Sequence, residues 1–368
     1  MASEKLAYLM PGFDIYANKI YMKLTYFRNL DGLRAVAALG VVVAHFFEDK
    51  LNAFPLLKAV SLQGHTGVSW FFVLSGFVIT RILLKSVQGA HYFRNFYGRR
   101  TLRIFPLYYF ALLCYHFLPY LLGINPVFPK FSTHWYFYVY LQNFARTFNW
   151  PISWPSHFWS LAVEEHFYLI WPALVYWVIS KSKNRLLLLS LALVAGATAL
   201  RYLMLIDNYE INVFTFTRLD QLSLGCILAI LESKGYLNAK ARSWFLALTA
   251  LGAIAVALCS RLDYFYLNVF KHNAYGLLYM GLTGYCIAEQ SATVVNRFLN
   301  SGLMQYLGKI SYGIYVWHRL VMLLHSHYFN PGNMAFDFLL ICVLTVMVSS
   351  ISFYVLESPF LKLKRYFE

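Results

Sequence analysis

The stretch LLLLSLALVAGATALRYLMLI, residues 186–206, contains one charged side chain, Arg201, in 21 positions. A helix of about 20 mostly apolar residues is long enough to cross the hydrocarbon core of a bilayer. Similar stretches recur along the whole chain, so this segment belongs to a series of such helices. We therefore predict an all-α fold, a polytopic bundle of transmembrane helices.

The composition of the 368-residue chain leads to the same prediction. Hydrophobic residues make up 60% of the chain and charged residues only 13%, with a mean hydropathy of +0.53. A soluble domain carries about 25% charged residues, so this chain has too few charges to cover a water-exposed surface of its size. The same values exclude a disordered, collagen-like or coiled-coil protein.

We predict about ten spans from the apolar segments. They lie near residues 30–48, 64–84, 104–122, 157–180, 186–206, 213–232, 243–260, 273–290, 303–328 and 336–357. The aromatic segment 134–146 is too short to span, and we expect an interfacial or re-entrant helix there. This pattern gives an N-terminal cytoplasmic or interfacial segment (1–28), a membrane domain (29–361) and a cytoplasmic tail (362–368).

The orientation follows from the basic residues, because cytoplasmic loops accumulate Lys and Arg. With the N-terminus inside, 21 of the 31 Lys and Arg residues lie on the cytoplasmic side. Both termini are therefore predicted to be cytoplasmic. We separately expect the protein to lie in the inner or plasma membrane of a bacterial cell. The net charge of +15 then reflects topology and contact with membrane lipids, and we expect no nucleic-acid partner. The five cysteines lack metal-ligand spacing, so we expect no metal site.

Ionisable residues inside predicted spans are costly and therefore suggest function. In DGLRAVAALGVVVAHFF, residues 31–47, the side chains of Arg34 and His45 are eleven positions apart. Eleven residues make three turns plus about 20°, so both project from one helix face about 16 Å apart along the axis. A histidine that only bridges two helices by hydrogen bonds is the alternative interpretation.

Two other segments contain charged groups of interest. YFRNFYGRRTLRIFPLYY, residues 92–109, is expected to be a cytoplasmic loop leading into a span, with Pro106 in the first helical turn. Its three closely spaced arginines suit fork-shaped recognition of phosphate, or they only set the topology. In HFWSLAVEEHFYLIWP, residues 157–172, the adjacent Glu164 and Glu165 could orient a histidine on another helix. For Arg218 and Asp220, a structural ion pair is as good an interpretation as function.

Taken in order, seven segments resemble the acyltransferase-3 family of membrane-bound O-acyltransferases. They are DGLRAVAALGVVVAHF, GVSWFFVLSGFVITRIL, FYGRRTLRIFPLYY, FWSLAVEEHFYLIWP, RLDQLSLGCILA, LGKISYGIYVWH and LESPF, and they extend from about residue 29 to 361. Many members of the family add an extracytoplasmic SGNH hydrolase-like domain. We expect this chain to be the stand-alone form without that domain.

The resemblance implies roles for the residues that match the family's motifs. It implies that His45 is catalytic and that Arg34 supports the cofactor or the site. It also implies that the Arg-x-x-Arg element, here Arg100 and Arg103 extended by Arg99, binds acyl-CoA.

The family's WSL-x-VEE element is matched through Glu164 and Glu165. Family members often carry Gln where this chain has His166, which leaves the role of that position open. As a working hypothesis, one of the two carboxylates orients the catalytic imidazole.

We therefore expect an acyl-CoA-dependent O-acyltransferase. It would move an acyl group, above all acetyl from acetyl-CoA, to a hydroxyl of a carbohydrate acceptor such as a surface polysaccharide, an oligosaccharide or a lipid-linked sugar. His45 would act as the general base, and Glu164 or Glu165 would orient it. The alternatives are a polytopic transporter or flippase, an acyltransferase that acts on a non-carbohydrate small molecule, and a catalytically silent membrane regulator. The oligomeric state stays open.

Overall fold

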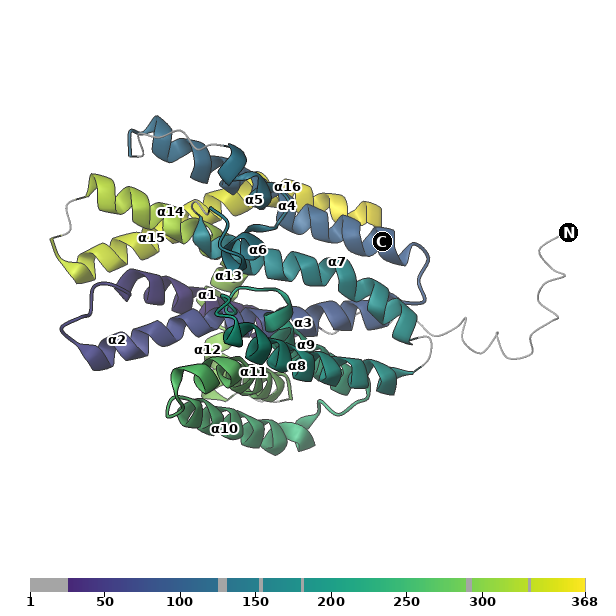
Figure 1. Cartoon of the computed structure of the whole chain (residues 1–368). Coiled ribbons are helices and arrows are strands. Elements are labelled where there is room, and N and C mark those ends of the chain that lie inside the picture. Colours follow the sequence, from purple (N-terminus) through teal and green to yellow (C-terminus); the bar gives the residue numbers. More distant parts are fainter. Residues whose placement is uncertain are drawn as a thin grey trace, which may run out of the picture.

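The computed structural model describes residues 26–124, 131–151, 155–179, 182–288, 293–329 and 332–367. Every regular element within these ranges is a helix, so the all-α prediction is confirmed (Figure 1). Of the predicted N-terminal segment 1–28, only the last three residues belong to the described part of the chain.

A helix is found at each of the ten predicted spans, and the long helices run along one common direction (Figure 1). They are α1 (Asn29–Phe47), α3 (Gly67–Ser86), α4 (Tyr92–Leu121), α7 (Trp159–Ile179), α8 (Lys183–Ile206), α9 (Leu219–Ser233), α10 (Arg242–Cys259), α11 (Tyr264–Ala288), α14 (Ser311–Tyr328) and α15 (Met334–Ser352). Among the described residues, six helical stretches are long and apolar enough to cross a membrane. These are Asn29–Phe47, Pro55–Ser86, Tyr92–Leu121, Lys183–Ile206, Ala239–Cys259 and Met334–Phe367. The exact number of spans stays a prediction.

The segment before the third predicted span is helical, contrary to the expectation of a loop. Helix α4 begins at Tyr92, so Pro106 lies in its interior and the basic residues before it occupy its first turns. A helix of 30 residues is about 45 Å long, which exceeds the roughly 30 Å of hydrocarbon in a bilayer. The polar first turns of α4 therefore have room to extend beyond the membrane core.

Shorter elements connect the long helices. The predicted span 303–328 is interrupted at Ile310, which separates α13 (Gly302–Lys309) from α14. The segment 134–146 forms two short helices, α5 (Trp135–Tyr138) and α6 (Gln142–Thr147), where one was predicted. The remaining short elements are α2 (Pro55–Leu62), η2 (Gln63–Thr66), η3 (Phe131–Thr133), η4 (Ser156–Phe158), η5 (Phe216–Arg218), η6 (Ala239–Ala241), α12 (Val294–Leu299), the π-turn Phe353–Glu357, α16 (Ser358–Lys362) and η8 (Leu363–Phe367).

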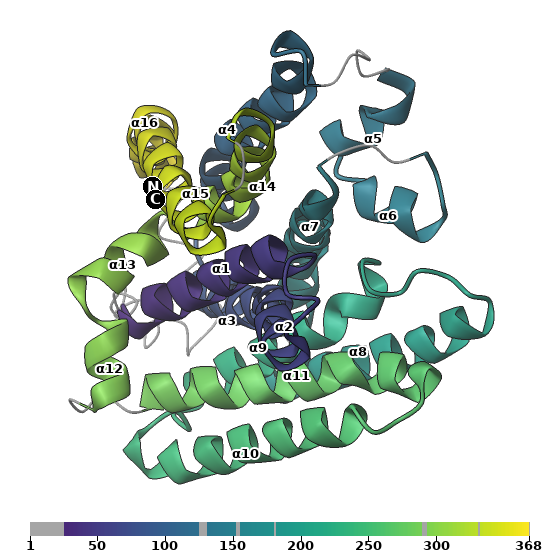
Figure 2. The same cartoon turned by 90° about the vertical axis from the view of Figure 1, so that its left-hand side faces the viewer.

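Helices α1 and α3 lie at the centre of the bundle (Figure 2). On one side are α8 to α11, and on the other are α4, α14, α15 and α16 (Figure 2). Helices α3 and α9 touch through their backbones, since a Cβ at Gly76 would come 1.9 Å from the carbonyl oxygen of Leu222, and one at Gly225 2.1 Å from that of Val73. This contact brings two helices closer than larger side chains would allow.

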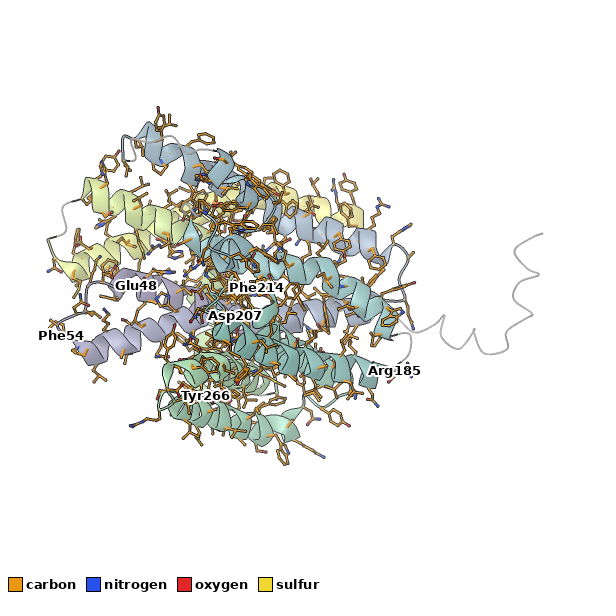
Figure 3. All side chains as sticks on the ribbon, viewed as in Figure 1. Glu48, Phe54, Arg185, Asp207, Phe214 and Tyr266 are labelled. Carbon is orange, nitrogen blue, oxygen red and sulfur yellow. The ribbon has the colours of Figure 1, made fainter. Side chains whose placement is uncertain are left out.

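The two ends of the bundle carry different chain segments. Glu48 and Phe54, which flank the connection from α1 to α2, lie at one end, and Arg185 at the start of α8 lies at the opposite end (Figure 3). The predicted topology assigns the end with Arg185 to the cytoplasm.

Candidate active site

A cavity of about 980 Å³ lies between α1, α3, α4, α7 and α14. Its volume is at the upper end of the range for small-molecule sites, about 300–1,000 Å³. Its wall includes six basic and two acidic side chains, which are Arg34, Lys85, Arg99, Arg100, Arg103, Lys364, Glu164 and Glu165. The excess of cationic groups makes the cavity suited to a ligand with several negative charges.

All four arginines predicted to bind the cofactor line this cavity. Arg34 comes from α1, whereas Arg99, Arg100 and Arg103 come from α4, where their spacing of three or four residues gathers them near one side of the helix. The structure therefore brings together two sequence motifs that are more than 60 residues apart. Each guanidinium presents several donors in a fixed fork, the geometry that matches phosphate oxygens.

Local contacts hold these arginines in place. Arg34 Nη1 donates to Asp31 Oδ1 at 3.0 Å, one turn earlier on α1. Arg99 Nε donates to the carbonyl oxygen of Phe367 at 2.7 Å, so the C-terminal turn η8 packs against the start of α4. The guanidinium of Arg100 lies 4.9 Å from the ring centroid of Tyr168, a cation–π contact across to α7.

Glu164 and Glu165 lie in the wall of the same cavity. Glu164 accepts hydrogen bonds from Ser75 Oγ at 2.7 Å and from the hydroxyl of Tyr168 at 3.1 Å. Glu165 Oε1 is buried and has no hydrogen-bond partner in the described part of the chain. The two carboxylates therefore share the wall of the cavity with Arg100 and Tyr168.

His45 lies in a group of four histidines, which we call the histidine cluster: His45, His65, His157 and His318. His45 Nδ1 is 2.9 Å from His318 Nε2, and the two rings stack at 5.0 Å. The ring of His65 is edge-on to His45 at 4.8 Å, and His157 is edge-on to His318 at 5.0 Å. Four separate elements (α1, η2, η4 and α14) supply these rings.

The structure places an imidazole rather than Glu164 beside the His45 ring, and the catalytic roles of Glu164 and Glu165 stay predictions. The hydrogen-bonding partner of the His45 ring on a neighbouring helix is His318, and the partners of Glu164 are Ser75 and Tyr168. The reason is the position along the chain: Glu164 follows His157 by seven residues, which corresponds to about 10 Å of helix. The carboxylates thus lie at the level of the arginines, and the histidine cluster lies nearer the other end of α7.

Tyr315 connects the cavity and the histidine cluster. It lines the cavity together with Ser160, whose Oγ is 2.5 Å from the hydroxyl of Tyr315. The same hydroxyl donates to the carbonyl oxygen of His157 at 2.8 Å, and the Tyr315 carbonyl accepts from His318 Nδ1 at 2.7 Å. The inner end of the cavity is therefore in direct contact with the groups that surround His45.

A family model described as an acyltransferase domain, Acyl_transf_3, matches residues 27–355. The chain belongs to the acyltransferase-3 family. O-acetyltransferase OatA of Staphylococcus aureus strain NCTC 8325 / PS 47 is 27% identical over 366 residues, covering 92% of this chain and 57% of that protein. OatA of S. aureus strain COL gives the same values. The S. aureus strain COL protein SACOL0978 is also 27% identical, covering 93% of this chain and 58% of its own length.

The chain therefore spans somewhat more than half the length of these curated relatives. No solved structure matches it significantly. The relatives share the family with this chain, and their names describe O-acetyl transfer.

The sequence of this acyltransferase-3 chain does not predict a site role for four residues near His45, which are His318, His157, His65 and Tyr315. His318 has a recognisable signal, since it is an ionisable residue in an apolar helix and ends the segment LGKISYGIYVWH. The other three have no comparable signal. His65 is in η2 and His157 in η4, both outside the long helices, and only the packing brings them next to His45.

The buried ion pair near η5 differs from the expected one. Asp220 pairs with Arg201 of α8 at 3.1 Å, and both side chains are fully buried. Arg218 instead contacts His272 of α11 and donates to Ser69 Oγ of α3 at 3.2 Å. The structural-pair interpretation is correct for Asp220, with a different arginine.

Proposed function

We propose that this chain is a membrane O-acyltransferase that moves an acyl group, specifically acetyl, from acyl-CoA to a hydroxyl of a carbohydrate acceptor. The observation that carries the proposal is the arginine-lined cavity whose inner end, at Ser160 and Tyr315, contacts the histidine cluster. A cationic entrance followed by candidate bases suits a long thioester with phosphates at one end. The O-acetyltransferase names of the relatives support the same reaction type.

The donor side of the proposal rests on charge. The phosphates of acyl-CoA would bind Arg34, Arg99, Arg100 and Arg103, because a guanidinium forms paired, charge-assisted hydrogen bonds with phosphate oxygens. Glu164 and Glu165 would then hold the arginines and Tyr168 in position, and their catalytic contribution would act through the donor site.

In the chemical step, His45 would act as the general base. Its ring would take the proton from the acceptor hydroxyl while the hydroxyl oxygen bonds to the acyl carbon. The bond between that carbon and the CoA sulfur then breaks, and the leaving sulfur takes the proton from the imidazolium. The products are an O-acyl ester and the free CoA thiol, so protons and electrons balance.

The acceptor would approach from the side of His65 and η2, opposite the arginines. His65 and His45 are both partly exposed, whereas His318 is fully buried behind them. The outward-facing rings are therefore the ones that a hydroxyl can reach. A carbohydrate fits this position because it offers several neutral hydroxyls to the imidazoles.

The test uses purified protein in nanodiscs, acetyl-CoA and a panel of acceptors comprising polysaccharides, oligosaccharides, lipid-linked sugars and small-molecule alcohols. We expect release of the CoA thiol to depend on a sugar acceptor, and mass spectrometry to detect one acetyl increment on the sugar. His45→Gln provides the matched inactive control. Thioester consumption needs no gradient, so a transporter would show none, and acetylation of only non-carbohydrate alcohols would replace the proposed acceptor class.

A further inference from the structure

We propose that His318 is a positioning residue that fixes the tautomer of His45, so that Nδ1 of His45 carries the proton and Nε2 is left as the base. The inference deepens the proposed function and rests on it for its catalytic meaning. The proposal follows from three groups linked in a row, which are the Tyr315 carbonyl, the His318 ring and the His45 ring.

The His318 ring is hydrogen-bonded to the backbone of its own helix. His318 Nδ1 lies 2.7 Å from the carbonyl oxygen of Tyr315. A carbonyl oxygen can only accept a hydrogen bond, so the proton of the neutral His318 ring is on Nδ1. Its Nε2 therefore carries a lone pair.

The position of the proton on His318 determines the position of the proton on His45, because the two rings are in contact. His318 Nε2 lies 2.9 Å from His45 Nδ1, and with a lone pair on Nε2 this contact is a hydrogen bond only if His45 Nδ1 donates. A neutral imidazole has a single ring proton, so Nε2 of His45 is unprotonated and available to take one.

Burial explains why this arrangement is stable. His318 is fully buried and is enclosed by Tyr315 and His157, whose ring centroids lie 5.8 and 5.0 Å away, whereas His45 is partly exposed. The inner ring is thus fixed by the helix backbone, and the outer ring keeps some exposed surface. In catalytic triads, a carboxylate fixes the tautomer of the histidine. Here the imidazole of His318, hydrogen-bonded to a main-chain carbonyl, would do so.

The experiment compares His318→Leu, which removes the acceptor, with His318→Gln, whose side-chain oxygen can replace Nε2. In protein labelled with ¹⁵N-histidine in nanodiscs, long-range ¹H–¹⁵N spectra report which ring nitrogen of His45 is protonated, with His45→Gln identifying its signals. We expect Nδ1 to be protonated in the wild type and in His318→Gln, and the proton to move to Nε2 in His318→Leu. In acyl transfer, His318→Leu should lower kcat by roughly 10²–10⁴-fold with KM for acetyl-CoA nearly unchanged, and His318→Gln should recover most of the loss.

His325→Leu is the matched control on α14, because it removes another buried histidine contact, the 3.3 Å pair with Asp337. It should lower thermal stability without changing the His45 spectrum. A wild-type spectrum with the proton on Nε2, or a His318→Leu protein that keeps the Nδ1 proton, would overturn the inference. The spectrum requires no turnover, so a wild type that fails to transfer acyl groups would overturn the proposed function separately.

Discussion

Arg34 and His45 project from the same face of α1, but Arg34 lines the arginine-rich cavity whereas His45 stacks on His318. The eleven residues between them correspond to about 16 Å of helix. One helix thus connects the two parts of the proposed site, the phosphate-binding end and the reacting end. Substitutions at the two residues should therefore affect different steps.

Replacing His45 by Gln should lower turnover by at least about 100-fold, the usual contribution of a general base. Acetyl-CoA affinity should change little, because the arginines that line the cavity lie around Arg34, near the start of α1, whereas His45 is near its end. Turnover per folded molecule and acetyl-CoA binding are measured in the same nanodisc sample. If His45→Gln protein turns over at the wild-type rate, His45 only bridges two helices.

Replacing Arg100 or Arg103 by Ala should weaken acetyl-CoA binding by about 1.5–3 kcal/mol for each lost charge-assisted contact. Lysine should restore only part of the affinity, because it lacks the planar fork. Calorimetry or a displacement assay measures the affinity. Arg185→Ala is the control, since this exposed arginine lies at the end of the bundle away from Glu48 and outside the cavity lining (Figure 3). Equal losses in all three variants would show a non-specific charge effect.

Reporter fusions test the topology. Fusions after residue 28, within 86–98 and after 362 should all report the cytoplasm, because 21 of the 31 basic residues then lie inside. A fusion within 48–54 should report the opposite side, since Glu48 and Phe54 lie at the other end of the bundle from Arg185 (Figure 3). An external signal from the 86–98 fusion would contradict the assignment of the arginines to a cytoplasmic ligand.

Asp220→Ala should destabilise the fold by about 3–5 kcal/mol, because it leaves the fully buried Arg201 without its ionic partner. Thermal unfolding in detergent measures the effect. Glu232→Ala is the comparison, as it breaks the less deeply buried pair with Arg81 at 2.7 Å and should cost less. Equal shifts in the two variants would mean that burial does not determine the energy of these pairs.

Gly64→Ala should lower stability by about 1–3 kcal/mol. A Cβ at this position would come 2.0 Å from the carbonyl oxygen of Gly40, so η2 would have to move away from α1 and take His65 with it. Gly196→Ala is the control, since a Cβ there meets no described atom within 4 Å and Ala favours the helix. Thermal unfolding of both variants checks the prediction, and a Gly64→Ala protein as stable as the wild type would contradict it.

The sequence predicts the helices well because each one needs a long apolar segment. It predicts the start of α4 poorly, since residues 92–103 are polar and aromatic and have no apolar stretch to mark a helix. The sequence does predict that Arg99, Arg100 and Arg103 lie close together, because they are closely spaced on α4. Partners on other helices, such as His318 for His45 and Arg201 for Asp220, depend on the packing of the bundle and leave no trace in residue spacing.

The chain of contacts from the Tyr315 carbonyl through His318 to His45 has a consequence for the timing of the reaction. The Tyr315 carbonyl has no formal charge, so an imidazolium formed on His45 finds no ion-pair partner within this chain of contacts. Protonated His45 would therefore be a short-lived species. We therefore expect the two proton transfers to be concerted. His45 would take the proton from the acceptor hydroxyl and deliver it to the leaving sulfur in one step.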